Sequence, residues 1–157
     1  MNRTANLLPR YVFGSQEIFH LSYNSSRHPF QVHKFNRTST KFAVKIEVYV
    51  FETKHLEWKL LLDFGRRPTL ERFQLAWSVD NATGGKTPHS FFILPNKLPG
   101  TGEFYLGIAP LLTKQLLEEW KNGTFNFSYA LVIYETSCRH WDEMLSTWSV
   151  GQCKVIS

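Results

Sequence analysis

The feature that most restricts the fold of this chain is the alternation of side chains over residues 42–51. The even positions carry apolar residues, which are Phe42, Val44, Ile46, Val48 and Val50, and the odd positions between them are mixed. A period of two, built from β-branched and aromatic side chains, predicts a β-strand with one face toward a core. The chain therefore contains at least one well-defined strand.

Further segments have the same character and are separated by turn-forming residues. They cover residues 58–64, 73–79, 90–94, 103–108 and 124–135. Short strands at near-regular spacing predict an all-β fold, and specifically an antiparallel β-sandwich. The exception is the stretch 111–120, whose leucines and Trp120 have helical spacing and predict a short helix that ends before Asn122.

The length of 157 residues and a hydrophobic content of 43% are typical of one folded domain. Residues 1–40 are polar and weakly periodic, and they predict an irregular or edge N-terminal segment with one short strand around 11–13. Residues 41–157 are predicted to form the β-sandwich.

Asparagine is unusually often followed by a glycosylation signal. Six of the eight asparagines lie in Asn-x-Ser/Thr, namely Asn2, Asn24, Asn36, Asn81, Asn122 and Asn126. Ser and Thr together make up 24 residues, so chance would produce roughly one such site. The excess predicts an extracellular, N-glycosylated protein. Since residues 1–21 lack a signal-like apolar segment and no stretch approaches about 18 apolar residues, we expect an internal piece of a longer exported protein, without its own signal or membrane span.

The charge pattern and the motifs argue against several functions. The net charge of +5 is spread along the chain, and its tightest cluster, Arg66-Arg67, is typical of a turn, so no nucleic-acid partner is expected. The six histidines show neither helical pairing nor finger spacing with cysteine, which predicts no metal site. Without a nucleophile motif or a reactive-cysteine context, we predict no catalytic residues, no cofactor and no enzymatic activity.

The carboxyl end carries the most specific pattern. Cys138 and Cys153 are the only cysteines, and between them lie Trp141, Asp142, Trp148 and Gly151. In an oxidising compartment the two thiols could close a disulfide, which would stabilise the fold by roughly 3 kcal/mol.

This pattern resembles the first half of the GPS motif of the polycystin family, large multi-pass membrane proteins related to polycystin-1. The resemblance covers a partial motif over residues 138–155, here called the GPS-like segment, in which Gln152 separates Gly151 from Cys153 where the family has Gly-Cys. Upstream stretches are similar to the region before GPS in those proteins; they are residues 49–51, 61–65, 68–70, 94–95 and 100–108.

The resemblance implies a GAIN-like β-sandwich in an ectodomain. In the family, the motif continues into two more cysteines and a self-cleaving His-Leu-Ser/Thr tripeptide, whereas this chain stops at Ser157. The family cysteines bridge to those downstream partners, so Cys138 and Cys153 here either pair with each other or remain free. The tripeptide at residues 20–22 precedes the cysteines and lacks the neighbouring Cys-x-Cys, so we interpret it as chance.

The leading hypothesis is a non-catalytic extracellular fragment of a polycystin-1-like receptor or ion channel subunit, on the outer face of the cell membrane. It would support GPS autoproteolysis and ligand or mechanical sensing in the intact protein, with Trp141 and Trp148 packed around the cysteines. Its partners would be the remainder of the parent protein and, by resemblance, a polycystin-2-like channel subunit. The alternative is an independent secreted β-sandwich that binds carbohydrate or protein; a hydrolase would require a polar pocket.

Overall fold

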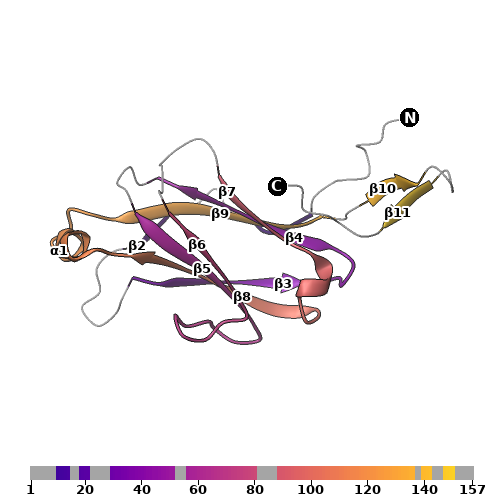
Figure 1. The fold of residues 1–157 in the computed structure, drawn as a ribbon, viewed down its shortest axis with the longest axis horizontal. Helices are drawn as coiled ribbons and strands as arrows, with labels where there is room; N and C mark the ends of the chain where they lie inside the picture. The colour runs from indigo at the N-terminus through magenta and orange to yellow at the C-terminus, as the bar shows by residue number, and fades with distance from the viewer. Residues whose placement is uncertain are drawn as a thin grey trace.

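The computed structural model describes the backbone of residues 10–14, 18–21, 29–51, 56–80, 88–136, 139–142 and 147–150. Two antiparallel sheets pack face to face, and a short helix lies at one end (Figure 1). This arrangement confirms the predicted antiparallel β-sandwich.

The first sheet, sheet A, is centred on the long strand β9 (Phe127–Thr136). On one side β9 pairs with β4 along its whole length, and on the other side β1 and β2 follow each other along it. These neighbours are β4 (Ala43–Val50), β1 (Arg10–Gly14) and β2 (Phe19–Leu21), and the outer strand of the sheet is β7 (His89–Ile93). The N-terminal strands β1 and β2 therefore pair with β9, a strand from the last third of the chain.

The second sheet, sheet B, has the order β3-β8-β5-β6. Its strands span β3 (Gln31–Arg37), β8 (Gly102–Leu111), β5 (Glu57–Phe64) and β6 (Leu75–Val79). A 3-10 turn, η1 (Pro95–Lys97), lies between β7 and β8. The strands expected from alternation at 42–51, 58–64, 73–79, 90–94, 103–108 and 124–135 all appear, within a few residues at their ends.

The predicted short helix is α1 (Lys114–Lys121). The side chain of Thr113 caps its first turn by accepting a hydrogen bond from the main-chain N–H of Leu116. Gly123, with a φ of +77°, follows the helix in a left-handed conformation that glycine adopts without steric cost. Leu116 and Trp120 are buried, so the helix covers that end of the core.

The core lies between the sheets and is lined by alternate residues of the long strands. Fully buried members of β4, β5, β8 and β9 include Val44, Ile46, Val48, Trp58, Leu60, Leu62, Phe104, Leu106, Ile108, Phe127, Leu131 and Ile133. The even-numbered apolar positions of residues 42–51 that lie within β4 therefore face the core, as the period-two pattern predicts.

The N-terminal forty residues contribute more strand than expected. The strand around 11–13 is present as β1, but β2 and β3 were not expected, and both join the sandwich. Alternation fails to reveal β3 because two of its three buried inward positions, His33 and Arg37, hold ionisable residues and only Phe35 is apolar. All three strands nevertheless lie along the side of a sheet, where an edge segment was anticipated.

The GPS-like segment forms a hairpin of its own. Strands β10 (Arg139–Asp142) and β11 (Thr147–Val150) pair with each other and, among the described residues, with neither large sheet. Figure 1 shows this hairpin beyond the end of the sandwich at which β9 finishes.

Candidate functional site

The described glycosylation candidates all lie on the surface. Asn36 is on the outward face of β3, between the buried Phe35 and Arg37. Asn122 ends α1, and Asn126 immediately precedes β9; all three side chains are exposed. Asn2, Asn24 and Asn81 lie outside the described residues. Each described site could therefore carry a glycan without disturbing the core.

The GPS-like candidates are only partly described. Trp141 in β10 lies directly opposite Trp148 in β11, and Asp142 lies opposite Thr147. Such cross-strand positions bring aromatic pairs into contact range in antiparallel sheets. The packing role of the two tryptophans stays a prediction, because the structure describes only their backbone. Cys138, Gly151 and Cys153 lie outside the described residues.

A buried polar cluster holds the end of β9 that leads to this hairpin. The carboxylate of Glu135, only 1% exposed, accepts hydrogen bonds from the main-chain N–H and the hydroxyl of Thr38, at 2.8 and 3.1 Å. Arg37, 2% exposed, donates to four main-chain carbonyls, those of Gly100 (2.8 Å), Thr40 (3.2 Å), Pro95 (3.2 Å) and Phe42 (3.5 Å). Burial lowers the pKa of Arg37, and the charge of Glu135 opposes that shift. The cluster ties two connections, the one between β3 and β4 and the one between β7 and β8, to the ends of β3 and β9.

A second buried polar pair links the two sheets. Nε2 of His33 in β3 lies 2.6 Å from the hydroxyl of Tyr129 in β9, and the ring of Phe19 packs against both. Burial lowers the pKa of His33 to about 4, so the imidazole is neutral at pH 7. The pair is a cross-sheet hydrogen bond that satisfies two groups inside an apolar core.

The described residues contain no group of three or more His, Cys, Asp or Glu that could hold a metal ion. Within the same part of the chain, no helix is long and apolar enough to cross a membrane.

A surface on the outer face of sheet B was not predicted from the sequence. The connection between β5 and β6, residues 65–74, folds back over the sheet instead of projecting away from it. Its Pro68 and the nearby Phe30 lie directly above Gly107 of β8, where an added Cβ would come within 3.2 Å of Pro68 and 2.6 Å of the Phe30 ring. Only glycine leaves room for this cover. We call residues 65–74 the cover loop.

The cover loop is fastened at both ends and at its tip. The N–H of Gly65 donates to Glu103 O (2.9 Å), and that of Gln74 donates to Leu62 O (2.8 Å). Thr69 and Arg72 exchange main-chain hydrogen bonds at 2.8 and 3.2 Å. Such a network holds the loop in one conformation.

A buried carboxylate strengthens the start of the cover loop. Asp63, whose side chain is 5% exposed, accepts from Nε of Arg66 at 3.0 Å and from the N–H of Phe64 at 2.9 Å. The carboxylate of Asp63 therefore neutralises the charge of Arg66. Two other arginines of the loop, Arg67 and Arg72, have no carboxylate partner among the described residues, and the side chain of Arg72 donates to the carbonyl of Arg67 (2.9 Å).

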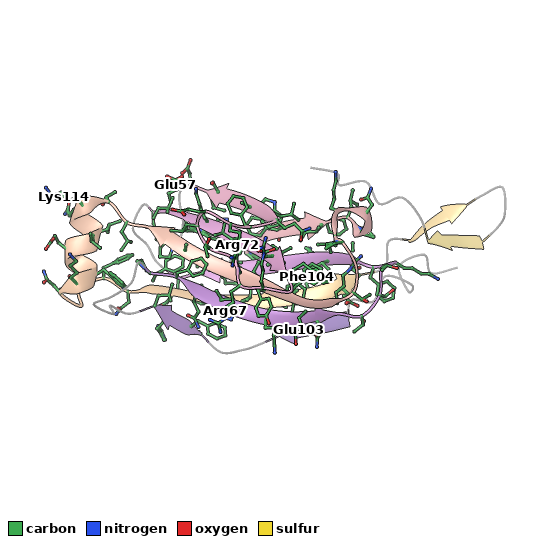
Figure 2. The ribbon with its side chains drawn as sticks, turned by 90° about the horizontal axis from the view of Figure 1, so that it is seen from below. Glu57, Arg67, Arg72, Glu103, Phe104 and Lys114 are labelled. Atoms are coloured by element: carbon green, nitrogen blue, oxygen red, sulfur yellow. The ribbon has the colours of Figure 1, made fainter. Side chains whose placement is uncertain are left out.

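The cover loop and the preceding end of β5 also expose apolar side chains. Phe64, Leu70 and Phe73 are 37%, 38% and 43% exposed, and they are three of the five large exposed apolar residues in the described chain. An open hollow of about 390 Å³ is lined by Phe30, Pro68, Thr69, Leu70 and Glu71. Figure 2, which looks onto this side, shows Arg67 and Arg72 over the middle of the sheet. The sequence signal for this surface is the interleaving of three arginines with apolar residues within residues 65–74. The sequence-based interpretation assigned Arg66 and Arg67 only to a turn.

Comparison with known proteins adds little about function. No family model and no curated protein matches the sequence. A solved structure that matches this chain is a carbohydrate-binding module, CBM36, in complex with calcium and xylotriose; it is 11% identical, and the match covers 84% of this chain and 94% of that one with a TM-score of 0.33. At that TM-score we draw no functional conclusion from the similarity.

Proposed function

We propose that this chain is a non-catalytic, N-glycosylated extracellular β-sandwich belonging to a polycystin-1-like membrane protein. In the intact protein it would act as the folded platform for the GPS region and take part in ligand or mechanical sensing. The partners would be the rest of the parent chain and a polycystin-2-like channel subunit.

The observation that carries the extracellular part is the excess of sequons, with Asn36, Asn122 and Asn126 all exposed. A glycan is bulky and polar, so an asparagine that carries one has to face solvent in the folded protein. Exposure alone does not distinguish a sequon, because asparagine is usually found at the surface and Asn96, outside any sequon, is exposed as well. Six sequons in eight asparagines, with every described one exposed, favour glycosylation in the secretory pathway.

The platform role is supported by the way β9 leaves the sandwich. Its last residues lie beside the buried Glu135–Thr38 hydrogen bonds and the Arg37 cluster. Breaking one side of a buried charged cluster typically costs about 3–5 kcal/mol. The end of β9 is therefore a firm attachment for a segment that follows it, which suits a domain that holds a cleavage region or bears tension.

The extracellular proposal is tested by expressing the chain in mammalian cells behind a heterologous signal peptide. We expect the secreted protein to shift in mobility when N-glycans are removed enzymatically. Replacing Asn36, Asn122 and Asn126 by Gln should remove three glycans from the intact mass. The matched control is Asn96→Gln, an exposed asparagine of η1 outside any sequon, which should remove none. A secreted chain unmodified at all three sites would contradict the proposal.

The family assignment is tested by the transcript that flanks the region encoding this chain. Two more cysteines, a His-Leu-Ser/Thr tripeptide and apolar spans downstream would support the polycystin-like parent. A stop codon soon after Ser157, together with a signal peptide upstream, would instead support the independent secreted binding module. The cover loop, with its exposed apolar residues and arginines, is the observation that favours a binding role in either case.

A further inference from the structure

We propose that the cover loop and the adjoining hollow form a protein-binding surface, and that the partner is an acidic segment which inserts one apolar side chain into the hollow. The proposal deepens the ectodomain role by giving it a binding site and rests on that role only for the location of the partner. It does not depend on the polycystin resemblance.

The first argument is preorganisation. The cover loop is held by main-chain hydrogen bonds at Gly65, Gln74 and the Thr69–Arg72 turn, and by the ion pair between the buried Asp63 and the exposed Arg66. Its Pro68 is buried against the sheet. A surface that is already ordered loses little conformational entropy on binding, so more of the contact energy appears as affinity.

The second argument is the exposure of apolar side chains that the fold does not need. Leu70, which lines the hollow, is 38% exposed, and Phe73, further along the cover loop, is 43% exposed. Contiguous exposed apolar residues on a soluble domain usually mark an interaction site. The hollow has room for a side chain, and its walls at Phe30, Pro68 and Leu70 are apolar.

The third argument is charge. Arg67 and Arg72 are exposed and have no carboxylate partner among the described residues, whereas Arg66 forms an ion pair with Asp63. Arginine beside aromatic and aliphatic residues is the composition enriched at binding hot spots. Since Glu71 forms part of the hollow wall, the carboxylates of the partner are expected to flank the inserted side chain, on the Arg67 and Arg72 side.

These features favour a polypeptide over an acidic polysaccharide. Polyanion sites depend mainly on dense positive charge, and here three arginines are accompanied by Asp63 and Glu71 within the same stretch. An apolar hollow contributes little to binding a highly sulfated chain. It contributes directly when an apolar side chain of a peptide is buried in it.

The test is a selection of short random peptides displayed on phage against the complete glycosylated chain. We expect enrichment of sequences in which a large apolar residue is flanked by Asp or Glu. Binding of a selected synthetic peptide, measured by fluorescence polarisation, should weaken about fivefold or more in Arg67→Glu and about tenfold in Leu70→Asp. It should also weaken as salt is added.

The matched control is the double variant Lys97→Glu/Lys114→Glu. Both lysines are exposed and lie on η1 and α1, so the variant lowers the net charge without touching the surface. Figure 2 shows Lys114 at the end of the molecule away from the labelled arginines. Thermal unfolding of every variant checks folding, and Arg67→Glu removes no described side-chain contact.

Two results would overturn the proposal. One is a selection that yields no acidic-apolar sequences, or yields peptides whose binding is unchanged by Arg67→Glu and Leu70→Asp. The other is retention on immobilised heparin that Arg67→Glu abolishes, in the absence of such peptides, because that would identify a site for acidic polysaccharide. A chain that is glycosylated but fails here leaves the extracellular proposal standing.

Discussion

His33 and Arg37 show how single residues of this chain place polar groups in an apolar core. Both occupy inward positions of β3, where an uncompensated polar group costs several kcal/mol. His33 hydrogen-bonds the Tyr129 hydroxyl, and Arg37 donates to carbonyls of the β3–β4 and β7–β8 connections. Each residue is tolerated only because the opposite sheet or the neighbouring loops supply its partners.

The depressed pKa of His33 predicts a stability that falls in acid. The imidazole has a pKa of about 4 in the folded protein and about 6.5 when unfolded, so the unfolded chain binds the extra proton between these values. Stability is therefore complete above pH 6.5 and is lost as pH falls toward 4. This one group should cost about 2 kcal/mol between pH 7.5 and pH 5.

Urea unfolding at the two pH values measures this loss. We expect His33→Gln, which cannot be protonated in this range, to be less stable than the parent at pH 7.5 but to lose about 2 kcal/mol less on acidification. An identical pH dependence in the parent and the variant would show that His33 does not cause it.

At the scale of elements, the cover loop depends on a missing side chain in β8. Gly107 lies under Phe30 and Pro68, so these two residues cover the outward side of β8 at that position. The absence of a side chain at Gly107 thus allows the cover loop to pack closely on β8, although the two are roughly forty residues apart in the sequence.

Gly107→Ala should displace Phe30 and loosen the cover loop. The new Cβ would lie 2.6 Å from the Phe30 ring, which has to move, and overpacking of this kind typically costs about 1–3 kcal/mol. The matched control is Gly100→Ala, where nothing lies within 4 Å of an added Cβ. Urea unfolding should show a loss of stability for the first variant and almost no change for the second. Equal stabilities would contradict the packing argument.

At the scale of the whole molecule, the two ends of the chain relate differently to the sandwich. β1 and β2 hydrogen-bond along β9, and Leu21 belongs to the core. Among the described residues, β10 and β11 pair only with each other. The amino end is therefore part of the domain, whereas the GPS-like hairpin is an appendage of it.

Two truncations of similar length test this difference. A chain that ends at Thr136 should keep a melting temperature within a few degrees of the parent. A chain that begins at Pro29 loses β1, β2 and Leu21, and we expect its melting temperature to fall by roughly 10 °C or more, with aggregation through the bared side of β9. Calorimetry measures both. A large loss in the first truncation would show that the GPS-like hairpin stabilises the sandwich.

The local pattern of the sequence was sufficient for the fold class. Alternation within β4, the turn residues between strands and the spacing of leucines in α1 are properties of neighbouring residues, and they identified most strands and the helix. The glycosylation candidates were likewise readable as short motifs, although their exposure was not.

Tertiary structure alone decided the rest. The buried polar residues of β3 are accommodated because Tyr129 partners His33 and the distant carbonyls of Pro95 and Gly100 partner Arg37, which no local pattern reveals. The cover loop lies over Gly107 because of packing between residues far apart in the chain, and its exposed arginines and apolar side chains became one surface only through that packing. Local periodicity records which way a side chain points within its own strand, whereas its partners are set by the pairing and packing of the whole chain.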